Sequence, residues 1–267
     1  MIKFDRDKYI SDQLPIEFEL LKIFSKKDYL TIFEIGACEG EDTIKYARTF
    51  SNSKIFSFEP LPKNHILIEQ NFKKFNIQNA SLIKVALSNI DGETTFHVSS
   101  VDPNINQIDL SSNWDYGNKS SSLLPPDKHI DEVGFIKFAE NIIVQTKKIS
   151  TFCNLQNIEI IDIIHMDVQG AELMVLQGAD SYINKIKIIW MEVSSIEYYK
   201  GQPLVDDVKA YMKAKNFYLL KNTLFGKQGD HLYISKFYFK KHSIIYLKII
   251  FFVRHIYIKV INRLKFL

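Results

Sequence analysis

Short apolar runs alternate with amphipathic segments along most of the chain, a pattern typical of an α/β fold. Strands are expected at seven places: 31–36, 54–59, 80–87, 160–167, 187–193, 217–220 and 231–234. The last two are spaced like an antiparallel hairpin. Helices are expected between and before the strands: 15–25, 42–49, 61–75, 151–156, 171–176 and 204–215. This order favours one sheet with helices packed against it.

The regular pattern disappears between residues 100 and 140. Just before this stretch, a turn at 89–92 and alternating residues at 93–99 predict a hairpin outside the main sheet. An irregular segment of this length in a compact domain is typical of a lid or a binding loop, unless it is disordered. We expect it to contact the substrate through aromatic and hydroxyl side chains, namely Trp114, Tyr116, Ser121 and Ser122.

The first two expected strands each carry a carboxylate at or near their end, as in proteins that bind an adenosine cofactor. The first strand carries Glu34 near its end, followed by Gly36 and Gly40. Gly36 lets the chain turn without a Cβ, and Gly40 lets the next helix begin against a ligand. About twenty residues later the second strand ends in Glu59, which could accept hydrogen bonds from both ribose hydroxyls.

The glycine spacing distinguishes between cofactors. A dinucleotide site has the pattern G-x-G-x-x-G, in which the second glycine admits a pyrophosphate. Cys38 occupies that position here, so no phosphate cradle is evident. S-adenosylmethionine has a ribose and an adenine but no phosphate, and a loop without that cradle fits it. The alternative is a strand-to-helix turn that needs glycine for its geometry alone.

A second polar stretch follows the apolar strand at 160–167. His165 and Asp167 are two residues apart, so both point to one face at the end where open α/β sheets bind ligands. An acid there is costly unless it is paired or faces a ligand, so we expect Asp167 to be functional. His165 could equally be the satisfied partner of a carboxylate. Glu172 begins the next helix, where the unsatisfied N–H groups favour a negative charge.

Six short motifs resemble, in order and spacing, the FkbM family of S-adenosylmethionine-dependent methyltransferases over residues 30–236. The motifs are E-I-G-A-x-x-G from Glu34, S-F-E-P from Ser57, V-A-L-S from Val85, V-Q-T from Val144, D-V-Q-G-A-E from Asp167 continuing to V-L-Q-G-A, and M-E-V from Met191. The block from Asp167 is the most specific of them. The chain departs from the family at His165, where the family often has lysine, and a titratable base stands there instead.

The resemblance implies a Rossmann-like class I methyltransferase fold. This is an α/β structure with a seven-stranded, mostly parallel sheet, an antiparallel last strand and helices on both faces. On this basis the chain divides into an N-terminal helical segment (1–29), a methyltransferase domain (30–236) with the inserted loop 100–140, and a basic tail (237–267). The cofactor-binding positions are expected to be Glu34, Gly36, Ala37, Gly40, Thr43, Glu59, Pro60, Ala86, Leu87, Ser88 and Asp167.

The activity implied is methyl transfer from S-adenosylmethionine, usually to a hydroxyl oxygen of a sugar or secondary metabolite, which leaves S-adenosylhomocysteine. Such a hydroxyl is not ionised beforehand, so a base that removes its proton is worth about 10²- to 10⁴-fold. We expect Asp167 or His165 to be this base and Glu192 to order the acceptor, with Glu172 beside it and His231 as a further candidate. A divalent metal held by Asp167 and Glu192 could activate the hydroxyl instead, but no dense carboxylate cluster indicates one.

Composition and charge narrow the class of protein. A chain of 267 residues with 46% hydrophobic content can bury one sizeable core. The two cysteines, Cys38 and Cys153, form no metal-spaced cluster, and residues 1–12 lack the apolar core of a signal peptide. We therefore expect a cytoplasmic protein.

The tail of the chain is strongly basic. Residues 236–267 contain eight Lys or Arg and no Asp or Glu. On a helix, Lys241, Lys248, His255, Lys259 and Arg263 fall on one side and leave a broad apolar remainder. Such a helix could lie on an anionic membrane surface, at the inner face of a plasma membrane, or it could pack on the domain or dimerise. Charges interrupt its apolar run too early for a transmembrane span.

Three classes of function remain open from the sequence. The first is an S-adenosylmethionine-dependent O-methyltransferase acting on a sugar hydroxyl of a surface polysaccharide, another glycan or a glycosylated precursor. The second is a catalytically inactive scaffold that binds a partner at a membrane. The third, a nicotinamide-dependent oxidoreductase, is opposed by the absence of G-x-G-x-x-G. A nucleic-acid partner is not expected, because the body has no basic stripe and no motif for a flipped base.

Overall fold

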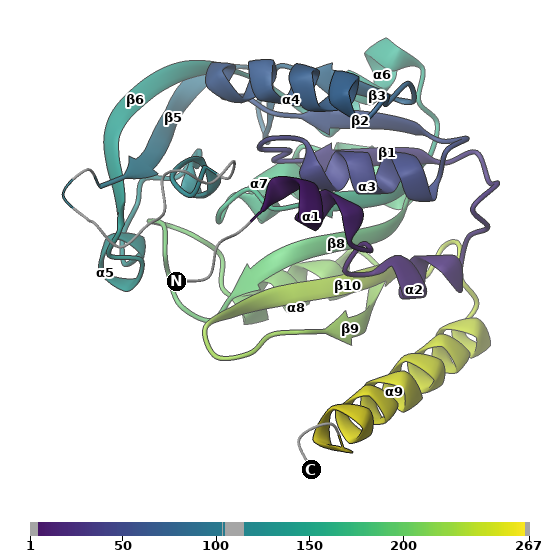
Figure 1. Ribbon diagram of the computed structural model, residues 1–267. Helices are drawn as coiled ribbons and strands as arrows, with labels where there is room; N and C mark the ends of the chain where they lie inside the picture. Colours follow the sequence, from purple (N-terminus) through teal and green to yellow (C-terminus); the bar gives the residue numbers. More distant parts are fainter. Residues whose placement is uncertain (1–4, 103, 105–114, 265–267) are drawn as a thin grey trace.

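A seven-stranded sheet with the strand order β3-β2-β1-β7-β8-β10-β9 forms the centre of the protein (Figure 1). The computed structural model describes residues 5–102, 104 and 115–264. The strands are β1 (Thr31–Ile35), β2 (Lys54–Phe58), β3 (Ala80–Ile83), β7 (Ile161–Met166), β8 (Ile186–Ser194), β9 (Phe217–Asn222) and β10 (Gln228–Ser235). β10 runs antiparallel to both of its neighbours, and the other pairs are parallel. The expected seven-stranded, mostly parallel sheet is confirmed.

Helices cover both faces of this sheet. On one face lie α2 (Glu17–Leu21), α3 (Glu41–Thr49) and α9 (Lys241–Leu264). On the other lie α6 (Ile149–Gln156), α7 (Glu172–Gln177) and α8 (Val205–Ala214). β7 is buried along its whole length between these layers, and its sequence is accordingly mostly apolar. Two further helices, α1 (Arg6–Ser11) beside α3 and α4 (Pro62–Lys74) beside β3, complete this part (Figure 1).

A second, three-stranded sheet corrects two expectations for residues 80–147. The strand expected at 80–87 is divided, because a tight turn in which the Val85 N–H donates to the Ile83 carbonyl (2.9 Å) ends β3. Ala86–Leu87 then forms β4 in the small sheet of order β4-β6-β5. β5 (Gly92–Val101) pairs not within a local hairpin but with β6 (Ile136–Lys147), on the far side of the irregular segment.

The segment between β5 and β6 returns over the carboxyl ends of the main strands. It contains a short 3-10 helix, η1 (Asn118–Ser120), and α5 (His129–Glu132). Gly117 packs so closely on β5 that a Cβ there would lie 2.5 Å from the Val101 nitrogen. The Ser99 hydroxyl donates to the Gly117 carbonyl oxygen at 2.5 Å. These contacts fix η1 above the edge of the sheet where the polar residues of the chain gather.

Candidate active site

A pocket of about 210 Å³ lies at the carboxyl ends of β1, β2, β4 and β7, with η1 on its far side. Ten of the residues singled out from the sequence line it: Glu34, Gly36, Ala37, Glu59, Pro60, Ala86, Leu87, Ser121, His165 and Asp167. Eight described ones do not: Gly40, Thr43, Ser88, Tyr116, Ser122, Glu172, Glu192 and His231. Trp114 lies outside the described residues. The first strand end, the second strand end and the Asp167 block therefore meet at one cavity.

The loop after β1 forms the floor of this pocket. Gly36 has a φ of +85°, and a Cβ at this position would lie 2.0 Å from the Asp167 carbonyl oxygen. The N–H groups of Gly36 and Ala37 both donate to the Phe58 carbonyl, each at 3.0 Å. Only glycine allows β1, β2 and β7 to end this close together. Gly40, at φ +81°, starts α3 and packs instead on Phe72 of α4, 3.2 Å from a Cβ placed there.

Glu59, directly after β2, is a carboxylate held in the pocket wall. Its Oε2 accepts from the Cys38 N–H and its Oε1 from the Leu61 N–H, both at 2.8 Å. Burial raises the pKa of Glu59 to about 7, although both hydrogen bonds act in the opposite direction. Each oxygen keeps a lone pair for a further donor, so the carboxylate can still accept from hydroxyls of a bound molecule.

Asp167 opens onto the pocket directly after β7. Its Oδ1 accepts from the Gln169 side-chain amide at 2.6 Å, and the same Nε2 lies 3.4 Å from Glu192 Oε2. Although Asp167 is open to the cavity, the surrounding protein atoms partly desolvate it and raise its pKa. Burial, and then the charge of Asp167, also raise the pKa of Glu192 on β8. Gln169 was not among the predicted site residues, although it stands inside the D-V-Q-G-A-E block.

His165 lies on β7, two residues before Asp167, and its side chain points to the same side of the sheet. Within the described part of the chain its Nδ1 is buried and has no hydrogen-bond partner. Oε1 of Glu34 lies 3.9 Å from this nitrogen. Burial raises the pKa of Glu34 well above its usual range, and Glu34 Oε2 accepts from the Thr43 hydroxyl at 2.9 Å. Thr43 thus supports Glu34 from behind the pocket.

Three carboxylates gather beside Gln169. Oxygen atoms of Asp167, Glu172 and Glu192 all lie within 4.8 Å of one another, close enough to hold a metal ion. Glu172 Oε1, however, accepts the N–H groups of Val168 (3.2 Å) and Gly170 (3.3 Å), so this side chain closes the turn between β7 and α7. Burial raises the pKa of Glu172 to about 7. A helix N-terminal role for Glu172 agrees with these contacts.

His231 lies in the core and not at the pocket. On β10 it pairs with Met191, so its side chain points to the face of the sheet opposite to Glu192 and Asp167. Its Nδ1 lies 2.9 Å from the Tyr233 hydroxyl, and burial lowers its pKa to about 4. At neutral pH the ring is uncharged and surrounded by protein. This placement suits a packing role.

The hydroxyls of Ser121 and Ser122, in the 117–122 segment beside the pocket, are engaged within the protein. Ser121 lines the cavity, but its Oγ accepts from the Ser99 N–H at 2.9 Å. Ser122 is buried, and its hydroxyl donates to the Gln169 carbonyl at 2.7 Å. Tyr116 is half-buried beside this segment and does not line the cavity. The segment is therefore bound to the loop that carries Asp167.

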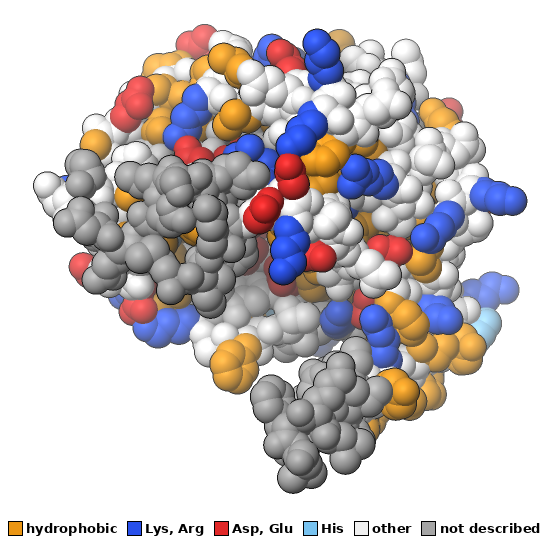
Figure 2. Space-filling model, in the orientation of Figure 1, with side chains coloured by type: hydrophobic (Ala, Val, Ile, Leu, Met, Phe, Trp, Pro, Cys, Tyr) orange, Lys and Arg blue, Asp and Glu red, His pale blue; other side chains and the backbone are white. Residues whose placement is uncertain are grey.

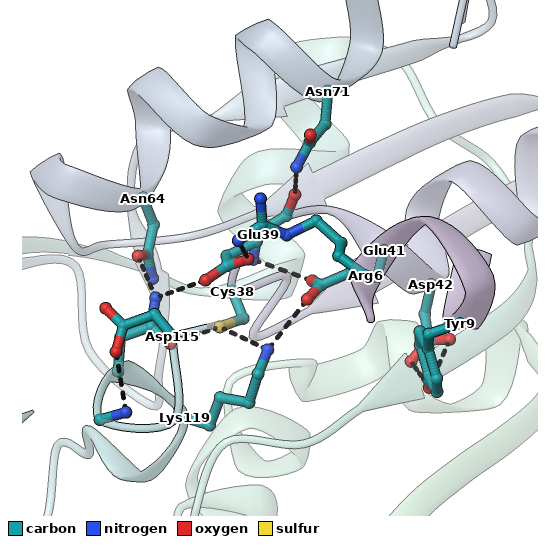
Figure 3. A network of polar contacts seen from close by, with 12 residues as sticks. Arg6, Tyr9, Cys38, Glu39, Glu41, Asp42, Asn64, Asn71, Asp115 and Lys119 are labelled. Atoms are coloured by element: carbon teal, nitrogen blue, oxygen red, sulfur yellow. Dashed lines mark hydrogen bonds and ion pairs between the residues drawn. The ribbon is translucent and has the colours of Figure 1, made fainter. Parts of the chain in front are cut away.

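Side chains from distant segments complete the pocket and were not predicted (Figure 3). Lys119 of η1 donates to Glu41 Oε1 at 2.9 Å and lies 3.5 Å from the Cys38 sulfur. Asn118 donates to Glu39 Oε1 (3.2 Å) and to Asn64 Oδ1 (2.9 Å). Burial raises the pKa of the Cys38 thiol, which keeps it protonated. These contacts join η1 to the loop after β1 and to α4.

The N-terminal helix α1 also reaches the pocket. Tyr9 lines it and donates to the Asp42 carboxylate, with oxygens at 3.1 and 3.2 Å. Arg6 forms an ion pair with Glu39 (Figure 3). A helical segment was expected within 1–29, but its contact with the pocket was not, because residues 5–12 have neither a clear apolar period nor a motif. The pocket is thus bounded by segments more than thirty residues apart along the chain.

Comparison with known proteins finds matches over most of the chain. Residues 34–219 match the model of the methyltransferase FkbM domain. The 2-O-methyltransferase NoeI of Sinorhizobium fredii is 29% identical over 192 residues, which cover 72% of this chain and 74% of NoeI. Methyltransferase 1 of Beauveria bassiana is 24% identical over 179 residues, or 63% of this chain and 69% of that protein.

Solved structures of similar fold are more distant. One is the precorrin-6y C5,15-methyltransferase of Geobacter metallireducens, with a TM-score of 0.43 and 13% identity, covering 87% of this chain and 91% of that one. Another is a SAM-dependent methyltransferase of Aquifex aeolicus, with a TM-score of 0.41 and 13% identity, covering 87% of this chain and 98% of that one. Likenesses at this level carry no argument about substrate. The match across the FkbM domain does decide the family: the chain belongs to the FkbM methyltransferases and is an S-adenosylmethionine-dependent methyltransferase.

Proposed function

We propose that the protein methylates a hydroxyl oxygen of a sugar, in a surface polysaccharide, another glycan or a glycosylated precursor. The observation that carries this proposal is that Glu59 and Asp167 line the same cavity. The first carboxylate suits the ribose of the cofactor, and the second suits a hydroxyl that must lose a proton. The name of NoeI, a 2-O-methyltransferase, supports an oxygen acceptor, and the FkbM resemblance supports a sugar.

The residues around the cavity fit S-adenosylmethionine. Gly36 lets the loop after β1 lie directly against the Asp167 backbone, where any side chain would clash. Glu59 presents a fixed acceptor for ribose hydroxyls, and Ala86, Leu87 and Phe96 give an apolar wall for a flat base. When bound, the cofactor supplies a methyl group already activated for transfer by its positive sulfur.

Asp167 is proposed as the general base. A proton acceptor works best when its pKa lies near the working pH, and the partial desolvation of Asp167 moves its pKa upward from the usual range. Gln169 holds one of its oxygens at 2.6 Å, which leaves the other to face the acceptor hydroxyl. Glu192 lies outside the cavity lining but beside Asp167, where it shares the same amide, and is proposed to order a second hydroxyl of an acceptor that extends beyond the cavity. Ordering two hydroxyls at once would favour a sugar over a simple alcohol.

His165 has a different place in this scheme. Its ring lies deeper in the fold than Asp167 and contacts Tyr46, with ring centroids 5.7 Å apart. We propose that it positions Asp167 through charge and packing, because a protonated His165 lowers the pKa of Asp167. His165→Ala is therefore expected to change the pH dependence of turnover more than its maximal rate.

The test is the release of S-adenosylhomocysteine with a panel of monosaccharides and oligosaccharides, followed by mass spectrometry of the acceptor. Asp167→Asn should lower turnover by about 10²- to 10⁴-fold and leave cofactor binding intact. Asp206→Asn, on the exposed surface of α8, is the matched control. If Asp167→Asn kept wild-type turnover, the assignment of the base would be wrong. Methylation of amines or carboxylates alone would contradict the hydroxyl acceptor.

As expected from the sequence, we propose that the enzyme works in the cytoplasm. S-adenosylmethionine is made there, and glycan precursors can be modified there before export. Within the described residues, no helix is both long enough and apolar enough to pass through a membrane.

A further inference from the structure

Among the residues of the long helix α9 whose side chains the structure describes, apolar residues form two faces, one packed on the domain and one exposed. Ile244, Leu247 and Phe251 are buried against the sheet and α2, with the Phe251 ring 6.1 Å from that of Phe18. This packed face explains why the helix lies on the domain. Packing on the domain and contact with a membrane were both expected for this helix, and the packed face accounts for the first of them.

The opposite face of α9 is exposed and, apart from His242 in the first turn of the helix, apolar. Tyr246, Ile249, Phe252, Val253 and Tyr257 each expose between 57% and 65% of their surface. Ile245 and Ile256 lie between them and are 49% and 45% exposed. At 100° per residue this face spans about 140° of the helix, centred opposite the packed side. An apolar surface of this breadth is typical of a binding face.

Basic side chains border the exposed face, and acidic ones are absent from it. Lys241 and Lys248 are exposed along one border, and Arg254, which contacts Glu19 at 3.6 Å and the Phe18 ring at 3.8 Å, lies toward the other. Residues 236–267 contain no Asp or Glu. Figure 2 shows hydrophobic and basic side chains next to one another at the lower right, over α9. The two tyrosines lie at the edge of the apolar strip away from the lysines.

These features favour one binding partner for the exposed face of α9. A second copy of this chain would bring the lysines of two α9 helices together with no acidic partner, which is unfavourable. An anionic lipid surface offers phosphates to the lysines and an acyl boundary to the isoleucines and phenylalanine. Tyrosine prefers the level of the lipid headgroups. The arrangement is that of a helix lying in the plane of a membrane.

We propose that the exposed face of α9 binds an anionic membrane surface, with Ile249, Phe252 and Val253 inserted at the acyl boundary and Lys241 and Lys248 at the phosphates. The rest of the enzyme would then remain in water, attached to the membrane-bound helix through the packed face of α9. This proposal goes beyond the methyltransferase activity and does not depend on the identity of the acceptor.

The experiment is flotation of the full chain with vesicles, one set of phosphatidylcholine alone and one containing phosphatidylglycerol. We expect binding only to the anionic set. Lys241→Gln with Lys248→Gln should weaken partitioning by about 25-fold, since each lysine near such a surface is worth about fivefold. Ile249→Gln with Phe252→Gln should weaken it by at least about tenfold.

Matched controls use positions of equal exposure elsewhere. Ile66→Gln with Leu155→Gln removes two residues that are 61% and 63% exposed on α4 and α6. Lys73→Gln with Lys213→Gln removes two exposed lysines far from α9. Both controls should bind vesicles like the wild type, and circular dichroism should show that all variants are folded.

Three results would overturn the proposal. The first is a folded wild-type chain that fails to float with anionic vesicles. The second is wild-type binding by the Ile249→Gln, Phe252→Gln variant. The third is a dimer in sedimentation experiments that this variant dissociates while no vesicle binding occurs, which would assign the face to a second copy.

Discussion

The side-chain amide of Gln169 donates to Asp167 Oδ1 across 2.6 Å. Gln169 itself adopts a left-handed backbone conformation, with a φ of 55°, which is uncommon for a residue with a side chain. The Ser122 hydroxyl donates to its carbonyl, and the Tyr199 hydroxyl lies 2.8 Å from its Oε1. The segment over the pocket and the chain after β8 thus orient the one amide that holds Asp167.

Replacing Gln169 should therefore change the pH profile of turnover. The amide hydrogen bond lowers the pKa of Asp167, so its loss in Gln169→Leu raises that pKa further. Because the base acts only when ionised, the acid limb of the kcat profile should move to higher pH and the maximal rate should fall about tenfold or more. Gln177→Leu on α7, whose contact is with Asn89, is the control. An unchanged acid limb would contradict the role of Gln169.

The raised pKa of Glu172 should make the free energy of unfolding depend on pH. Its pKa is raised to about 7 by burial, so between about pH 4.5 and 7 the folded chain keeps a proton that the unfolded chain releases. Stability is therefore lost as the pH rises through this range, by up to about 3 kcal/mol at 1.36 kcal/mol per pKa unit.

Glu172→Gln should remove this loss, because the amide oxygen can still accept the two backbone N–H groups. Urea unfolding should show the variant gaining free energy of unfolding over the wild type on going from about pH 5 to about pH 8. Glu140→Gln, at an exposed position on β6, should show no such change. A difference between Glu172→Gln and the wild type that does not vary with pH would contradict the account.

Gly36→Ala should destabilise the fold by more than the cost of placing alanine in a left-handed backbone conformation. The left-handed conformation costs a non-glycine residue about 1–2 kcal/mol, and the new Cβ would also strike the Asp167 carbonyl at 2.0 Å. Gly201→Ala isolates the first cost, because its φ is +78° and nothing lies within 4 Å of its Cβ. Thermal unfolding of both variants measures the difference. Equal losses of stability would show that β1 and β7 can separate freely at this point.

A chelator should leave turnover unchanged. Of the three carboxylates that could hold a metal, Glu172 is engaged by two backbone N–H groups, and Gln169 reaches the other two. Asp167 is proposed to remove the proton without a metal ion. Turnover with and without EDTA tests this directly. Loss of activity that magnesium restores would assign these carboxylates to a metal site instead.

The strand ends that line the pocket could be predicted from the sequence. Glu59 and Asp167 each follow an apolar run, and a polar residue in that place has few positions to occupy other than the ligand edge of a parallel sheet. The division of the strand at 80–87 could not be predicted, since apolar character continues through Val85 while the chain changes sheets.

The residues that close the pocket from outside were missed for another reason. Lys119 and Asn118 stand in a segment without periodicity, and their partners Glu41 and Asn64 are more than fifty residues away. Tyr9 reaches Asp42 from a helix of six residues, too short to give a periodic signal. Such contacts arise only from the folded arrangement. On β10, by contrast, the alternation of side chains does decide that His231 faces the core.

We propose that Glu59 holds the ribose of the cofactor in this pocket. The test is calorimetric titration of the wild type, Glu59→Ala and the exposed control Glu140→Ala with S-adenosylhomocysteine. The account predicts a dissociation constant on the order of micromolar for the wild type and the control, and loss of measurable binding in Glu59→Ala. A folded wild type that binds no S-adenosylhomocysteine, or a Glu59→Ala variant that binds it as tightly as the wild type, would contradict the account.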